Sequence, residues 1–128
     1  MAEQTTLVIV LPHAVKGKQV NPIIIRFLAQ GLEIIKSELR NINAAQAEKL
    51  CAKDTNKEQL VTNLTSGLCM IMQIRGEEAI RRVWDLKGPP IDAPRGTING
   101  DHPSLSPLIR ASSDEDSAKL ESRILFGY

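Results

Sequence analysis

Apolar residues fall into short runs along the chain, and these runs predict four strands. Residues 6–11 (Thr-Leu-Val-Ile-Val-Leu) are rich in β-branched side chains and are closed by Pro12, which favours a buried strand. A run with imperfect alternation covers 32–42, and a run rich in Met and Ile covers 68–74. The apolar segment 123–126 predicts a final strand.

Helix-start and helix-stop residues stand between these runs. Asn21 and Pro22 predict an N-cap and a first helical position, and Gly31 predicts the end of that helix. Asn43 is expected to cap a helix that reaches about Ala52. Further helices are expected over 57–64, 77–86 and 114–120.

The segment from Lys87 to Pro107 differs in composition from the rest of the chain. Five prolines and three glycines fall in these 21 residues, which indicates one long loop and no regular element. The order of elements is then strand, helix, strand, helices, strand, helix, loop, strand.

This βαββαβ order predicts the fold class. It is typical of an α/β (α+β) protein with a ferredoxin-like, four-stranded antiparallel sheet and helices packed on one face. At 128 residues, the chain is expected to form a single domain over 1–128.

The amino-acid composition excludes some classes of partner. The net charge is +1 and only 3% of residues are aromatic, so neither a nucleic-acid partner nor a membrane partner is expected. Cys51 and Cys69 are isolated and lack the spacing of a metal site or a disulfide framework, which favours a cytoplasmic protein.

Several segments, in the right order, resemble the nucleoside diphosphate kinase family. They are residues 11–15 (Leu-Pro-His-Ala-Val), 95–101 (Arg-Gly-Thr-Ile-Asn-Gly-Asp), 108–112 (Leu-Ile-Arg-Ala-Ser) and 116–121 (Asp-Ser-Ala-Lys-Leu-Glu). The family has Lys-Pro-Asp-Gly-Val, Pro-Gly-Thr-Ile-Arg-Gly-Asp, Ile-Ile-His-Gly-Ser and Asp/Glu-Ser-Ala-x-x-Glu there. The resemblance spans nearly the whole chain and implies the nucleoside diphosphate kinase-like fold.

The same resemblance implies which functional residue of the family is lost at each position where this chain differs from the motifs. The family's enzymes pass a phosphoryl group through a histidine, and Arg110 stands at that position. A guanidinium stays protonated and has no free lone pair, so it cannot be phosphorylated and turned over in this way. Leu11, Asn99 and Pro107 stand where the family has its phosphate lysine, its phosphate arginine and its sugar-binding asparagine.

These departures lead to the expectation of a pseudokinase, which is not an enzyme. In that interpretation the chain is a non-catalytic protein-interaction or structural module. By analogy with other members of the family, the module is expected to belong to a ciliary or axonemal assembly. Ser112 and Glu121 would remain as the former support of the histidine.

Two alternatives stay open. A nucleotide sensor would hold a magnesium nucleotide weakly through Arg110, Arg95, Arg82 and Ser112. A residual phosphotransferase would work by direct transfer without a histidine intermediate. Otherwise Arg110 pairs with Glu121 or a nearby acid and fills the pocket.

The sequence contains two histidines, His13 and His102. His13 and His102 are interpreted as loop histidines, no metal site is expected, and no resident cofactor is expected. The expected partners are other proteins or further domains of a larger polypeptide. A homodimer or a monomer is favoured over a larger assembly.

Overall fold

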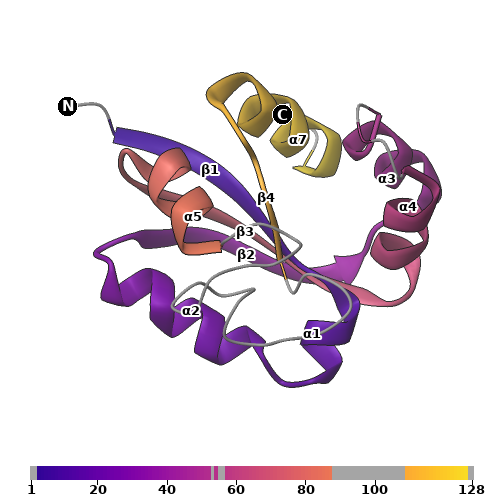
Figure 1. The fold of residues 1–128 in the computed structure, drawn as a ribbon, viewed down its shortest axis with the longest axis horizontal. Coiled ribbons are helices and arrows are strands. Elements are labelled where there is room, and N and C mark those ends of the chain that lie inside the picture. Colours follow the sequence, from indigo (N-terminus) through magenta and orange to yellow (C-terminus); the bar gives the residue numbers. More distant parts are fainter. Residues whose placement is uncertain (1–2, 53, 55–56, 88–108, 127–128) are drawn as a thin grey trace.

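A four-stranded antiparallel sheet forms the centre of the molecule, and helices pack around it (Figure 1). The computed structural model describes residues 3–52, 54, 57–87 and 109–126. The strands are β1 (Glu3–Val10), β2 (Glu33–Asn41), β3 (Leu68–Glu77) and β4 (Ile109–Ala111). The helices are α1 (Pro12–Lys16), α2 (Val20–Ala29), α3 (Ala44–Leu50), α4 (Lys57–Thr65), α5 (Ala79–Lys87) and α7 (Glu115–Phe126).

The strand order is β2-β3-β1-β4, so β3 and β1 are the two central strands. Ile9 lies opposite Ile71 of β3 on one side and opposite Arg110 of β4 on the other. Both central strands carry the apolar runs seen in the sequence, because a strand covered on both faces has no exposed side for polar residues. The predicted four-stranded antiparallel α/β fold is confirmed.

Helices cover both faces of the sheet, so the prediction that they pack on one face is wrong. Successive residues of β1 point to opposite faces. Val8 and Val10 belong to one buried cluster, whereas Leu7 and Ile9 belong to another. The continuous apolar run at 6–11 was the sign of this double coverage.

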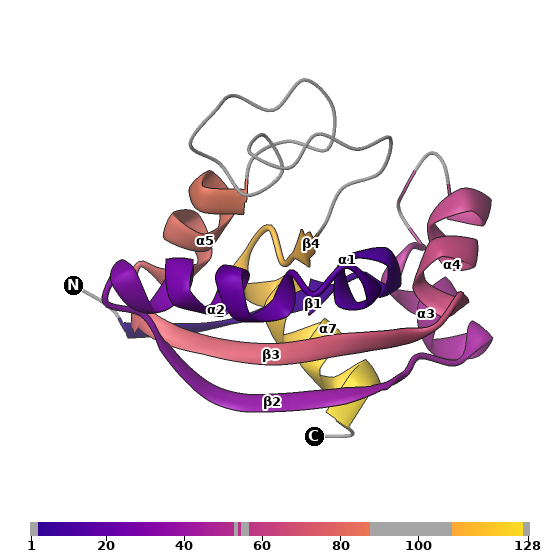
Figure 2. The same cartoon turned by 90° about the horizontal axis from the view of Figure 1, so that it is seen from below.

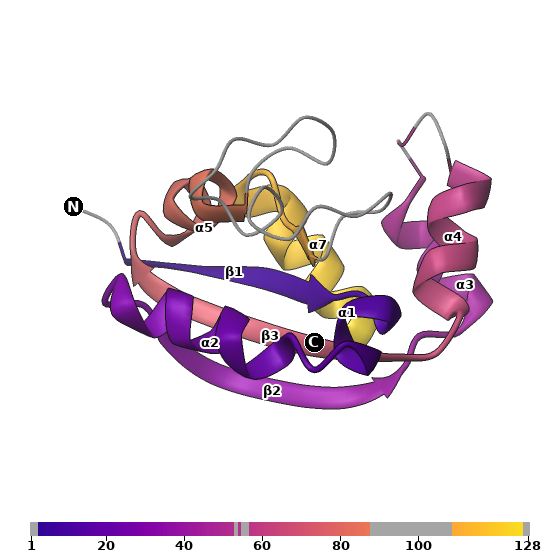
Figure 3. The same cartoon turned by 60° about the horizontal axis from the view of Figure 1, so that its bottom comes forward.

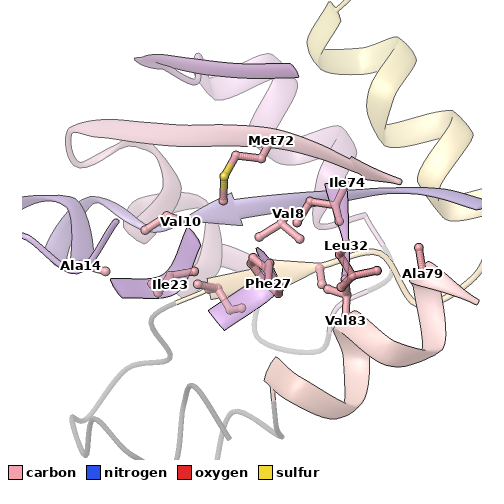
Figure 4. Close-up of a cluster of buried hydrophobic side chains, with 12 residues drawn as sticks. Val8, Val10, Ala14, Ile23, Phe27, Leu32, Met72, Ile74, Ala79 and Val83 are labelled. Atoms are coloured by element: carbon pink, nitrogen blue, oxygen red, sulfur yellow. The ribbon is translucent and has the colours of Figure 1, made fainter. Parts of the chain in front are cut away.

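The first cluster lies between the sheet and the helices α1, α2 and α5 (Figure 4). Phe27 and Ile23 of α2 are fully buried against Val8 and Met72 of the sheet. α2 lies along this face of the sheet in Figure 3. Loss of the Phe27 side chain would cost about 3–5 kcal/mol, the usual range for a buried aromatic residue truncated to alanine.

The second cluster joins the opposite face to α3, α4 and α7. Leu50, Leu64 and Leu125 pack there against Ile9 and Ile71. The α3–α4 hairpin and α5 lie at opposite ends of the sheet, with β4 between them (Figure 2). This arrangement places β4 between two helical walls.

Some element boundaries differ from the sequence prediction. The expected strand at 123–126 is wrong, because α7 continues through Phe126 and buries Ala118, Glu121 and Leu125 at helical spacing. Residues 12–16 form α1, which was not predicted, and α2 begins at Val20, so Asn21 is not its cap. Of the predicted loop 87–107, only Lys87 belongs to the described residues, and it ends α5.

The start of α3 is as predicted. Asn43 Oδ1 accepts a 2.8 Å hydrogen bond from the Gln46 backbone amide, and Gln46 Oε1 accepts one of 3.3 Å from the Asn43 amide. This reciprocal pair satisfies two amides that the helix leaves without partners. It fixes the hairpin that faces β4.

None of the helices in the described part of the chain is both long enough and apolar enough to span a membrane.

Candidate functional site around Arg110

Arg110 occupies the middle of β4. Ile109 and Ala111 on either side of it belong to the first buried cluster. Because neighbours along a strand point to opposite faces, the Arg110 side chain extends toward the face that carries the α3–α4 hairpin. Its side chain is 24% exposed, so it is partly shielded from water.

The guanidinium of Arg110 is held by the end of α3. Its Nη2 donates a 2.7 Å hydrogen bond to the backbone carbonyl of Leu50, and its Nη1 lies 3.2 Å from Asp54 Oδ2. The last carbonyls of a helix lack partners within the helix and carry partial negative charge, which favours a cation there. Arg110 therefore joins β4 to the hairpin.

Ser112 and Glu121 form a buried pair beside Arg110. Ser112 Oγ lies 3.2 Å from Glu121 Oε1 and donates to it, while the Ser112 amide donates to the Leu7 carbonyl at 3.1 Å. Burial raises the pKa of Glu121, and the Arg110 charge and the Ser112 hydrogen bond act in the opposite direction. Ser112 of the segment after β4 thus positions the Glu121 carboxyl group, and the Arg110 charge lowers its pKa.

Lys87 ends α5, which packs against β4. Only 6% of the residue is exposed, and its Nζ lies 4.1 Å from the centre of the Trp84 ring. Burial lowers the pKa of Lys87, and the Arg110 charge lowers it further. Lys87 was missed in the sequence because it was interpreted as the first residue of a loop.

The two cysteines are buried free thiols. Burial raises the pKa of Cys51, with the Arg110 charge acting against it, and burial raises the pKa of Cys69 to about 11. Among the described residues, no group of histidine, cysteine and acidic side chains gathers in a way that would hold a metal ion.

The other predicted site residues do not converge on Arg110. Leu11 is buried in the second apolar cluster. Arg82, on α5, donates hydrogen bonds to the carbonyls of Gln30 and Glu77. In Figure 2, α5 lies at the end of the sheet opposite the α3–α4 hairpin. Arg95, Asn99 and Pro107 lie outside the described residues.

Comparison with known proteins decides the family. The family model described as nucleoside diphosphate kinase matches residues 4–128. The chain belongs to the nucleoside diphosphate kinase family.

Relatives match nearly the whole chain. The chain is 37% identical to the nucleoside diphosphate kinase of Sulfurisphaera tokodaii, covering 98% of this chain and 90% of the relative. It is 34% identical to that of Methanocaldococcus jannaschii, covering 97% and 94%. The nucleoside diphosphate kinase of Halobacterium salinarum, solved in complex with CDP, superposes with a TM-score of 0.91 at 29% identity, covering 99% and 90%.

The expectation of a non-catalytic module is contradicted by these relatives. Relatives at 34–37% identity over nearly the full length of both chains are named as an enzyme, which supports an active kinase. The expected pseudokinase with a ciliary or axonemal place is corrected on the same finding.

The expected loss of activity rested on several departures from the family's motifs taken together, at Leu11, Asn99, Pro107 and Arg110. The alignments to these two relatives span 134 and 131 positions, more than the 128 residues of the chain, so they contain gaps. Assignments made from motif likeness alone, such as those of Asn99 and Pro107, depend on where such gaps fall. The chemistry of an arginine at position 110 does not depend on where these gaps fall, and it determines which route of phosphoryl transfer is open to the chain.

Proposed function

We propose that this chain transfers phosphoryl groups between nucleoside phosphates at the cationic site around Arg110. The observation that carries the proposal is its 34–37% identity to nucleoside diphosphate kinases over 97–98% of its length. The CDP in the Halobacterium salinarum structure supports a nucleoside diphosphate as one ligand. The substrates are then a nucleoside triphosphate and a nucleoside diphosphate, each taken with magnesium.

Arg110 has the role of a phosphate contact in this proposal. By resemblance it stands at the position of the phosphate-carrying histidine, but its guanidinium keeps its proton and has no lone pair to attack phosphorus. A planar cation with five N–H donors suits the oxygens of a phosphoryl group and stabilises the charge that they carry in the transition state. Arg110 uses two of its nitrogens on Leu50 and Asp54, and its Nε is buried without an acceptor among the described residues.

The proposed route is direct. An oxygen of the diphosphate's terminal phosphate attacks the γ-phosphorus in line, and the bond from that phosphorus to the donor's bridging oxygen breaks. The donor leaves as a diphosphate and the acceptor becomes a triphosphate. Ser112 and Glu121 hold β4 and the Arg110 backbone in place during this step.

The route is tested with MgATP labelled at its γ-phosphate and unlabelled CDP. We expect label in CTP and none retained on the protein after rapid denaturation in base, which preserves phosphohistidine. Label on the protein that disappears in His13→Asn or His102→Asn would overturn the direct route while leaving transfer itself intact. Absence of labelled CTP at every enzyme concentration would overturn the proposed function.

A homodimer and a cytoplasmic location remain predictions. The chemistry proposed above depends on neither of them.

A further inference from the structure

A depression of about 330 Å³ lies between α7 and the strands β1 and β3. That volume falls in the range of roughly 300–1,000 Å³ that is typical of sites for small molecules. The side chains that line it come from all three elements: Thr5, Gln73, Ala118, Lys119, Ser122 and Arg123. The phosphoryl transfer proposed above uses none of them.

α7 separates this depression from the site around Arg110. The helix packs against β1, which has β3 on one side and β4 on the other. Glu121 accepts its 3.2 Å hydrogen bond from Ser112, which follows β4. The next residue of the helix, Ser122, accepts a 3.3 Å hydrogen bond from Gln73 of β3. The depression therefore lies on the β3 side of the helix, and the Arg110 site lies on the β4 side.

Two cations stand beside each other at the depression. Lys119 and Arg123 are one turn apart on α7, and like charges at this spacing repel each other. Within the described part of the chain, neither takes part in an ion pair. Glu115, one turn before Lys119, instead accepts a 3.1 Å hydrogen bond from Gln4. An anion between the two cations would replace their repulsion by charge-assisted hydrogen bonds.

The acidic side chains on the strands below do not cancel this positive charge. Arg75 lies opposite Thr5 and holds Glu3 and Glu33 in ion pairs of 3.6 and 2.9 Å. Lys36 of β2 lies opposite the residue of β3 that forms the floor, so it adds a further positive charge on this face. The depression is thus electropositive.

The floor supplies neutral hydrogen-bonding groups. Gln73 is only 8% exposed, and its Nε2 donates to Ser122 Oγ. Because Ser122 is the acceptor in that bond, its own O–H remains a donor, and no described residue accepts from it. The Thr5 hydroxyl is likewise without an acceptor among the described residues. Two hydroxyl donors therefore lie beside the two cations.

We propose that this depression binds a small anionic molecule, whose oxyanion group is held by Lys119 and Arg123. The planar guanidinium of Arg123 suits two oxygens of a phosphate or a carboxylate, and Lys119 adds a compact positive charge. The Thr5 and Ser122 hydroxyls donate to the remaining oxygens. The ligand class is a compact molecule with a phosphate or dicarboxylate group. This site is separate from the transfer site and does not rest on the proposed function.

The proposal is tested by NMR titration of the isotope-labelled full chain with inorganic phosphate and, separately, with malonate, at an ionic strength held constant with chloride. We expect saturable shifts of the Gln73 side-chain amide and of the backbone amides around Ser122 with one of these anions. The anion that saturates identifies the oxyanion as a phosphate or a dicarboxylate. Absence of saturation with either anion up to about 50 mM overturns the site.

Variants show which side chains hold the anion. Arg123→Gln and Lys119→Gln should each weaken binding by at least about tenfold, since charge-assisted hydrogen bonds are lost. Lys49→Gln on α3 is the matched control at an exposed lysine, and it should bind as wild type does. Arg110→Met should also bind as wild type, because Arg110 lies on the other side of α7. Equal affinity in wild type and Arg123→Gln, or loss of these shifts in Arg110→Met, overturns the site.

Thermal stability gives a readout of opposite sign. In chloride alone, Arg123→Gln and Lys119→Gln should melt at the wild-type temperature or slightly above it, because the repulsion within α7 is removed. With the saturating anion, wild type should gain stability and both variants should gain less, since a ligand stabilises only the protein that binds it. An equal gain in wild type and both variants would be a general effect of the salt and would overturn the site.

Discussion

Arg110 donates a 2.7 Å hydrogen bond to the carbonyl of Leu50, a residue 60 positions earlier in the chain. The bond ties the shortest strand of the sheet to the end of α3. It also fixes where the only arginine of β4 presents its charge. The phosphate contact proposed for Arg110 and the local architecture therefore depend on the same side chain.

Replacement of Arg110 by methionine should lower the free energy of unfolding by about 1.5–3 kcal/mol, because a part-buried hydrogen bond from a charged donor to the Leu50 carbonyl is lost. Asp54→Asn should cost less than about 1 kcal/mol, since the ion pair is partly exposed and the asparagine amide oxygen still accepts from the guanidinium. Urea denaturation measures both. A larger loss in Asp54→Asn than in Arg110→Met would show that the ion pair, and not the Leu50 bond, holds the hairpin.

Glu121 should make folding stability depend on pH. Its pKa is raised in the folded protein, so its contribution to stability is present below the unfolded pKa and is lost as pH rises through the folded pKa. Glu121→Gln should therefore gain stability relative to wild type as pH rises from the unfolded pKa of about 4.3 through the folded pKa. Ser112→Ala removes a hydrogen bond that favours the charged form, so it should make the pH dependence steeper. A pH-independent difference between Glu121→Gln and wild type would contradict the raised pKa.

Gly76 permits the close packing of β3 against Leu32. A Cβ at position 76 would lie 2.7 Å from Leu32 Cδ2, and Leu32 is itself buried in the first cluster. Gly76→Ala should cost about 1–3 kcal/mol through overpacking. Gly67→Ala is the matched control, because its Cβ would meet Pro12 at an ordinary 3.4 Å, and it should change stability by less than about 0.5 kcal/mol. A thermodynamic cycle with Leu32→Ala should show coupling between positions 76 and 32; additive costs would rule out the steric explanation.

The central strands were predictable because their apolar runs are long and rich in β-branched residues. β4 was not, since three residues are too few to show a period, and the apolar segment at 123–126 was mistaken for the missing strand. The burial of Ala118, Glu121 and Leu125 shows the signal that was available: their spacing is helical.

The site was predictable only where motif resemblance reached. Arg110, Ser112 and Glu121 lie close together in the sequence and in the fold. The partners of Arg110, Leu50 and Asp54, come from a distant hairpin that no sequence spacing connects to β4. Lys87 was not predicted as a buried residue, because the burial of a lysine at a helix end depends on tertiary packing. The prolines and glycines that follow it in the sequence indicated only a loop.

The most direct test of phosphoryl transfer at Arg110 is the specificity constant, kcat/KM, for CTP formation from MgATP and CDP, measured on wild type, Arg110→Lys and Arg110→Met purified side by side. Wild type should turn over, and Arg110→Met should fall by about 100-fold or more, the usual cost of one charge-stabilising donor. Arg110→Lys should lie between them, because an ammonium keeps the charge and loses the planar donors. Equal rates in wild type and Arg110→Met, or no CTP from wild type, would contradict the account.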